Sequence, residues 1–198
     1  MDVVKPANQP SYRQQQAQAT RARVAQAAQQ LFQAQGYAAT SIEAIAAAAG
    51  VAVSTVYAIY RNKRSILAAI CEAWLEAAEI RPLLEGALHD PDPRSRMATA
   101  ARWTRQQWER GSEIVPLLDT AAQSDADVAV MLKEWIQEKS GAMALFVSAL
   151  ESALRPGLEL SRARNVFDAL TIPEIYRDLV ERSGWSPAAY EEWLAATL

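Results

Sequence analysis

SIEAIAAAAGVAVSTVYAIY, residues 41–60, is the stretch that decides the fold. Apolar residues recur at helical spacing on both sides of Gly50, and glycine suits a helix end because it tolerates the left-handed conformation. The pattern predicts a short helix that Ser41 opens and Gly50 ends, a tight Gly-Val turn, and a second short helix over Val53–Ile59. Alanines such as Ala46 and Ala49 let two helices cross closely. The stretch therefore predicts a helix-turn-helix.

The second helix of such a motif faces a DNA groove, and its side chains here are small or carry hydroxyls. They are Val53, Ser54, Thr55 and Tyr57. A methyl group such as that of Val53 can pack on a thymine methyl. Basic residues follow and can bind phosphates, which add affinity without sequence information; they are Arg61, Lys63 and Arg64. Because no Arg, Asn or Gln lies between Ala52 and Ile59, we expect readout through apolar and hydroxyl contacts and through DNA shape.

The rest of the chain also has helical spacing, so the sequence predicts an all-α fold. A first helix is expected from Gln15 to Gln35 and a fourth from Lys63 to Ile80, with a break at Pro82. Asp90-Pro91-Asp92-Pro93 is the clearest linker. Further helices are expected over 93–110, 112–123, 125–154, 160–171, 173–182 and 186–198, with Ser112, Asp125 and Ser186 as N-caps.

Charge is unevenly distributed along the chain. Residues 1–66 hold seven basic and two acidic residues, a net charge of +5, whereas the remainder holds 13 basic and 21 acidic residues, a net charge of −8. A basic N-terminal third favours a module that binds a polyanion. Arg21 and Arg23 are expected either to contact the DNA backbone or to form solvated surface. The polar segment 1–14, with Lys5 and Arg13, is expected to be a disordered tail, with a minor-groove arm as the alternative.

One ordered, gap-free set of residues carries a resemblance: Leu31-Phe32, Gly36-Tyr37, Thr40-Ser41-Ile42, Ile45-Ala46, Ala49-Gly50-Val51, Ser54-Thr55-Val56-Tyr57, Tyr60, Asn62-Lys63 and Leu67. With these residues, the stretch from Arg21 to Leu67 resembles the DNA-binding domain of the tetracycline-repressor-like (TetR/AcrR) family of transcriptional regulators. The resemblance implies a DNA-binding domain with its linking helix over 15–80, after an arm over 1–14. It also implies a helical body over 81–198 that binds a small molecule and forms a homodimer. In this family, ligand binding moves the linking helix and lowers affinity for the operator.

Site residues follow from the resemblance by position. Thr40 and Ser41 stand where a hydroxyl or a main-chain N–H meets a phosphate at a helix N-terminus. Tyr57 and Lys63 match the family's usual phosphate contacts, and residues 53–55 match its base contacts. The alternative for Tyr57 and Tyr60 is core packing, which we expect only for Tyr60. Ala52 replaces a common serine cap, so the recognition helix is expected to begin later, with Ser54 as a possible cap. Ala58 and Ile59 replace an aromatic or histidine pair that is common in the family, which puts in doubt any operator sequence inferred from relatives.

The helix expected over Asp125–Leu154 has apolar residues spread over about 160° of its circumference, more than the roughly 100° of a simple surface helix. This excess indicates burial against the helix's own core and against a second surface. A partner subunit is the economical explanation, with a central helix in a monomer as the alternative. The expected dimer residues are Val147, Leu150, Leu154, Phe167 and Leu170.

Aromatic and polar residues on the next helices suggest a ligand pocket, because such pockets are apolar cavities with a few polar groups. The expected lining residues are Trp103, Gln106, Gln107, Leu117, Leu118, Met131 and Trp135. The alternative for each is ordinary core packing. A pocket of this composition favours a small apolar or aromatic effector.

Other classes of protein fit poorly. The only cysteine, Cys71, is expected in the core, and the only histidine, His89, is expected to be exposed, so we expect no enzyme, metal or cofactor. No run approaches the ~18 apolar residues of a membrane span, and nothing points to secretion, so a soluble cytoplasmic protein is expected. The leading hypothesis is a repressor that binds a palindromic double-stranded operator and is released by a ligand. The alternatives are a helix-turn-helix regulator controlled by a protein partner, and an activator.

Overall fold

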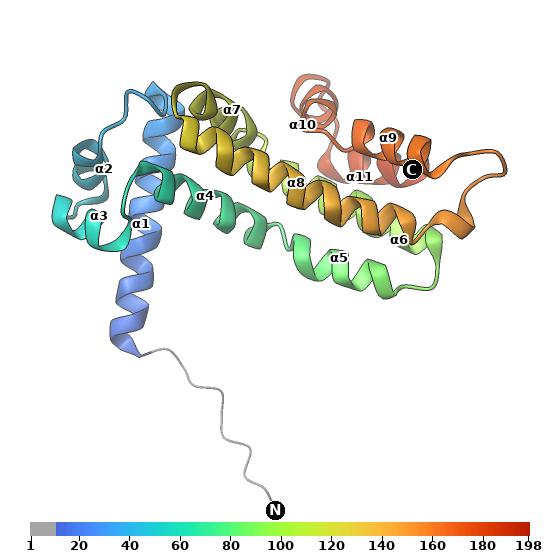
Figure 1. Cartoon of the computed structure of the whole chain (residues 1–198), viewed down its shortest axis with the longest axis horizontal. Coiled ribbons are helices and arrows are strands. Elements are labelled where there is room, and N and C mark those ends of the chain that lie inside the picture. The colour runs from blue at the N-terminus through green and yellow to red at the C-terminus, as the bar shows by residue number, and fades with distance from the viewer. Residues whose placement is uncertain (1–10) are drawn as a thin grey trace, which may run out of the picture. The chain divides into compact units, whose positions relative to one another are not determined.

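The computed structural model describes residues 11–198, which form helices and turns and contain no strand. The all-α prediction is confirmed. Figure 1 shows the helices in chain order. They are α1 (Tyr12–Gln35), α2 (Ile42–Ala49), α3 (Val53–Ile59), α4 (Lys63–Ala77), α5 (Ile80–His89), α6 (Pro93–Gly111), α7 (Ile114–Ser124), α8 (Ala126–Ser148), α9 (Leu160–Leu170), α10 (Pro173–Tyr176) and α11 (Pro187–Thr197).

The chain divides into two compact units, Met1–Ile70 and Cys71–Leu198. The boundary between Ile70 and Cys71 falls inside α4, ten residues before the boundary expected between residues 80 and 81. We call the first unit the reader and the second the body. The expected tail with Lys5 lies outside the described residues, apart from residues 11–14. These four begin α1 through a capping box, in which the Ser11 hydroxyl accepts from the Gln14 main chain and the Gln14 side chain accepts from Ser11 N–H.

The reader has a small, mainly apolar core. It is built from one face of α1, the inner faces of the two short helices and the start of α4. Its fully buried aliphatic and phenylalanine side chains include Val24, Phe32, Ile45, Val56, Ile66 and Leu67. Phe32 packs against Tyr37, with ring centroids 5.1 Å apart. This core fixes α2 and α3 on α1, because each contributes a face whose burial excludes water.

Pro82 does not break the chain, contrary to the prediction. It lies in the first turn of α5, where the N–H that proline lacks has no partner within the helix in any case. The break comes earlier, at Glu79, a non-glycine residue with φ of 52°. The linker was placed correctly, because Asp92 caps α6 by accepting from Arg94 N–H and Pro93 takes the first helical position.

The body core centres on an aromatic cluster from α6, α8 and α9. Trp103 packs edge-on against Phe146, with centroids 4.8 Å apart, and Phe167 lies 5.6 Å from Phe146. A second contact joins α4 to α6: the indole N–H of Trp74 donates to the Gln107 main-chain carbonyl at 2.8 Å. These contacts bury the aromatic surface of the body without leaving the indole N–H unsatisfied.

Helix ends in the body differ from the predictions in three places. The helix predicted over 173–182 is α-helical only as far as Tyr176 and continues as a π-helix over Arg177–Arg182. Ser112 does not cap α7 but ends α6, and its hydroxyl bonds to Glu181 at 2.8 Å. Helix α8 ends at Ser148 rather than residue 154, and a short 3₁₀ turn follows at Glu151–Ala153. The caps predicted at Asp125 and Ser186 are confirmed.

Candidate nucleic-acid interface

Helices α2 and α3 meet at 102°, within the range of helix-turn-helix motifs. The Ser41 hydroxyl begins α2 by accepting from Ala44 N–H at 3.1 Å. Gly50 ends α2 with φ of 64°, a left-handed conformation that a residue with a Cβ adopts only at a cost. The main-chain N–H of Val51 then bonds back to the Ala46 carbonyl at 3.0 Å. The turn is therefore set by local backbone chemistry.

Helix α3 divides into an inner and an outer face. On the inner face, Val56 is buried, and so is Tyr60, the residue just after the helix, as predicted. Ser54 and Tyr57 face solvent, and Tyr57 is 51% exposed. Val53 and Thr55 are half-buried at the edges of this face. A short helix with small, hydroxyl-bearing residues outward has the shape and chemistry that a major groove admits.

The start of α3 corrects one expectation. The helix begins at Val53 with Ala52 as its N-cap residue, and Ala52 provides no side-chain oxygen. Ser54 lies within the first turn and does not cap it. The missing serine therefore leaves the helix in place and removes only the capping hydrogen bond.

The Thr40 side chain faces into the protein, and its main-chain N–H donates to the Tyr37 carbonyl at 3.3 Å. The residue is 1% exposed, and its hydroxyl donates to the Gly36 carbonyl at 2.8 Å while accepting from the Gln35 amide at 3.2 Å. The hydroxyl stabilises the turn between α1 and α2. Ser41, the next residue, is exposed.

Lys63 has an intramolecular role that the sequence did not reveal. Its ammonium donates to the Tyr37 carbonyl at 2.8 Å and to the Ala38 carbonyl at 3.4 Å, and it lies 4.6 Å from the centre of the Tyr37 ring. An ammonium has three N–H donors, so two contacts leave one for a phosphate. Lys63 thus ties the start of α4 to the loop before α2. Arg61 is exposed and Arg64 is half-buried.

A contact that the sequence did not predict joins α1 to the end of α3. The Arg21 guanidinium lies 4.9 Å from the centre of the Tyr60 ring, and the Tyr60 hydroxyl donates to the Arg21 carbonyl at 3.1 Å. Tyr60 is the residue that ends α3. No spacing rule connects positions 39 residues apart, so only the fold shows this pair.

The expected dimer residues need correction. Val147, Leu150 and Phe167 are at most 7% exposed and belong to the body's own core; Leu154 and Leu170 are half-buried. Helix α8 also has large apolar side chains that are exposed, at separate points of its circumference. Its large exposed side chains are Val130, Ile136 and Leu145, and α9 adds Val166.

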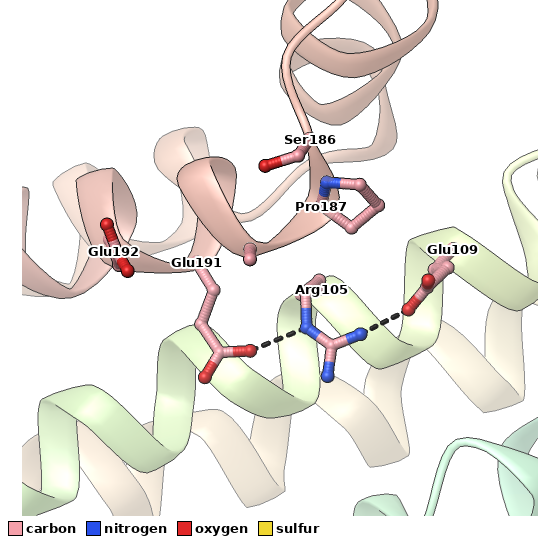
Figure 2. Close-up of a pocket in the computed structure, with 7 residues that line it drawn as sticks. Arg105, Glu109, Ser186, Pro187, Glu191 and Glu192 are labelled. Atoms are coloured by element: carbon pink, nitrogen blue, oxygen red, sulfur yellow. Dashed lines mark hydrogen bonds and ion pairs between the residues drawn. The ribbon is translucent and has the colours of Figure 1, made fainter.

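The expected pocket residues differ in burial, and the structure does not decide between pocket lining and core packing for them. Trp103, Gln107, Leu117 and Leu118 are buried, and Met131 and Trp135 are half-buried. The Gln106 side-chain oxygen is buried with no hydrogen-bond partner among the described residues. A hollow of about 410 Å³ lies elsewhere, between α6 and α11. Figure 2 shows Arg105 in this hollow, paired with Glu191 at 2.5 Å and with Glu109, so its chemistry is ionic rather than apolar.

Two further kinds of site, for a metal ion and for a membrane, were also expected to be absent. No group of His, Cys, Asp and Glu in residues 11–198 is arranged to hold a metal ion. In the same residues, no single helix has the length and apolar character needed to cross a membrane; only the bent pair α2–α3, taken together, meets that test.

The single cysteine and the single histidine lie where the sequence predicts. Cys71 is buried, and burial, with a smaller effect of Glu72, raises its pKa to about 12. His89 is exposed, as predicted.

Residues 24–70 match the model of the tetR family of bacterial regulatory proteins. The chain carries the N-terminal domain of the TetR family. The matched region contains α2, α3 and the buried half of α1, so the match coincides with the geometry described above. TetR-family members are DNA-binding regulators rather than enzymes, in agreement with the prediction.

Solved structures of transcriptional regulators, one of them described as TetR-family, share the fold over nearly the whole chain. A regulator from Syntrophomonas wolfei is 19% identical, with 91% of this chain and 93% of that chain covered and a TM-score of 0.69. FadR from Bacillus subtilis, in complex with stearoyl-CoA, is 16% identical over 88% and 95%, with a TM-score of 0.65. A regulator from Saccharomonospora viridis, in complex with choline, is 16% identical over 89% and 94%, with a TM-score of 0.64. No curated protein sequence matches the chain. The chain therefore has the fold of a TetR-family transcriptional regulator.

Proposed function

We propose that this chain is a dimeric transcriptional repressor that binds a palindromic double-stranded operator through α3 and releases it when a small molecule binds the body. The geometry of α2 and α3 carries the first part of the proposal. They meet at 102°, and α3 presents Ser54 and Tyr57 outward beside the exposed Arg61. Base contacts by residues 53–55 would specify the sequence, and phosphate contacts by Tyr57, Arg61, Lys63 and Arg64 would position the helix.

The proposed dimer forms through α8 and α9. Leu145 on α8 is 67% exposed and Val166 on α9 is 53% exposed, although both are large apolar residues. A second copy that covers these side chains would remove apolar surface from water. A two-fold dimer also explains why a palindrome is expected, because the symmetry of the site mirrors that of the protein.

The proposed effector is a small apolar or aromatic molecule. Related folds bind stearoyl-CoA in one protein and choline in another, so the fold is compatible with effectors of different chemistry. In this chain, the unpartnered oxygen of Gln106 is buried on α6, the helix that also carries the buried Trp103 and Trp108. A ligand donor that satisfied this oxygen would be favoured, because a buried acceptor without a partner costs free energy. Cytoplasmic location follows from this proposal, since the operator is genomic DNA.

Control by a protein partner is the second candidate. The burial of Trp103, Leu117 and Leu118 favours it, because buried side chains of this kind are what ordinary core packing predicts. The sign of regulation depends on where the operator lies, so an activator has the same protein chemistry.

A selection from random double-stranded DNA with the purified protein tests the proposal. We expect a palindrome with half-sites about one helical turn, or a multiple of it, apart. Recovery of sequences that share no motif, with binding that only follows salt concentration, would contradict sequence-specific recognition. Adding small molecules to the protein–operator complex then separates a ligand-released repressor from one that needs a protein partner.

A further inference from the structure

Helix α1 has two halves of different character. Its C-terminal half packs into the reader core through Val24, Ala27, Ala28 and Phe32. Residues 11–23 are exposed, apart from the half-buried Thr20, and Figure 1 shows this half running on beyond α2 and α3. The family match begins at residue 24. We call residues 11–23 the α1 extension.

The α1 extension carries basic but no acidic residues. Arg13, Arg21 and Arg23 are exposed, and no Asp or Glu occurs between Asp2 and Glu43. At 3.6 residues per turn, the three arginines fall within about 160° of the circumference, so they share one side of the helix. The extension has no apolar stripe, and a helix that is polar all round lacks a protein core to pack on. Its charge complements a polyanion.

The contact with Tyr60 places the α1 extension next to the recognition helix. Arg21 lies over the ring of the residue that ends α3, and its carbonyl accepts from the hydroxyl of that residue. Residues 12–20 then continue for about 14 Å beyond Arg21, at 1.5 Å per residue. One strand of B-DNA carries a phosphate every 3.4 Å, so this length corresponds to about four base pairs.

We infer that the α1 extension is a second DNA-binding element, which contacts backbone phosphates just outside the half-site that α3 reads. The inference rests on the proposed function. Arg13 and Arg23 bind phosphates directly, whereas Arg21 also holds the extension on Tyr60. Because phosphates carry no sequence information, the extension adds affinity and leaves sequence preference unchanged.

The test compares two duplexes that carry the selected operator, one trimmed to the palindrome and one extended by about six base pairs on each side. The proteins are the full chain, R13A/R23A, R13K/R23K and a matched control, R94A/R110A, in which two exposed arginines of the body are lost. Arg21 is left unchanged because it packs on Tyr60. Circular dichroism checks that every variant keeps its helices.

We expect the full chain to bind the extended duplex about 10-fold more tightly at low salt, with a salt slope that is steeper by about 0.9 for each added phosphate contact. R13A/R23A should bind both duplexes alike, R13K/R23K should restore the preference, and R94A/R110A should behave as the full chain. If R13A/R23A keeps the full preference for the extended duplex, the inference is overturned while the proposed function stands. If no protein binds the trimmed operator, the proposed function itself fails and the inference fails with it.

Discussion

The indole ring of Trp74 occupies the space that a side chain at Gly111 would need. A Cβ at Gly111 would lie 1.9 Å from Trp74 Nε1, the atom that donates to the Gln107 carbonyl. The ring also packs on Trp108, with centroids 5.8 Å apart. Glycine at 111 therefore lets the C-terminal part of α4 approach α6 closely enough for an indole-to-carbonyl hydrogen bond.

Gly111→Ala is expected to displace the indole and break this bond. Overpacking of this kind costs about 1–3 kcal/mol in the free energy of unfolding, measured by urea denaturation. Gly86→Ala is the matched control, because Gly86 lies in α5 with open space around its Cβ position. That substitution should stabilise by about 0.5–1 kcal/mol, as alanine does in a helix interior. Equal effects of the two substitutions would show that the close approach of Trp74 is unimportant.

Arg61→Ala should weaken binding to operator and non-operator DNA by similar factors. Arg61 is exposed just after α3, and loss of one phosphate contact lowers the salt slope by about 1. Thr55→Val should instead change the preference among operator variants, because its hydroxyl lies at the edge of the outward face. Binding titrations on a set of single-base operator variants separate the two effects. Arg81→Ala, an exposed arginine of the body, is the control and should change neither.

Lys63→Ala should lower stability as well as DNA affinity. The ammonium holds the carbonyls of Tyr37 and Ala38. Because the side chain is half-exposed, the loss should be about 1 kcal/mol, below the usual range for charged hydrogen bonds. Thermal unfolding without DNA measures it, with Arg61→Ala as the variant that should unfold like the wild type. An unchanged melting temperature for Lys63→Ala would mean that the contacts of the ammonium with the two carbonyls do not stabilise the fold.

Leu145→Lys should convert a dimer to a monomer at micromolar concentration. The substitution places a charge in the apolar surface that the proposed interface covers, and it leaves the protomer core intact because Leu145 is 67% exposed. Sedimentation equilibrium reports the change. Leu158→Lys is the comparison, since Leu158 is an exposed apolar residue outside α8 and α9. A wild-type protein that sediments as a monomer would remove the dimer from the proposal.

Cys71 should react slowly with Ellman's reagent at pH 8 until the protein unfolds. Burial raises the pKa of its thiol to about 12, whereas an unfolded cysteine titrates near about 8.5. Between these values the unfolded chain has lost a proton that the folded chain keeps, so stability falls as pH rises. Cys71→Ala removes this contribution, and its stability relative to wild type should improve from pH 8 to pH 11. Burial also raises the pKa of Tyr176 to about 12, but this residue is present in both proteins. A relative stability that stays constant with pH would contradict the raised pKa.

The sequence predicts the helix-turn-helix well because its signals are local. Gly50, the Ser41 cap and the spacing of apolar residues each concern neighbours within one or two turns. Pro82 misleads for the opposite reason: proline breaks a helix interior but is tolerated in a first turn, and only the observed start at Ile80 distinguishes the two.

Tertiary contacts set the limits of prediction at the site. Spacing places Thr40 at a helix start, but burial turns its hydroxyl inward to Gly36. On α8, periodicity indicates two apolar sides without saying which belongs to the protomer core. Val147 and Leu145 are two residues apart and lie on different sides, one buried and one exposed. Arg21 and Tyr60 have no local signal at all.

The position of the unit boundary inside α4 has a consequence for protein engineering. A chimaera that joins this reader to the body of a relative must be spliced within a continuous helix, between Ile70 and Cys71. One inserted or deleted residue there would turn the rest of the helix by about 100° and shift it by about 1.5 Å. Trp74 and Gly111 both belong to the body and would keep their contact, so the change would fall on the phase between the reader half and the body half of α4. Functional hybrids should therefore occur only when the splice preserves helical phase, whatever the similarity of the two parent sequences.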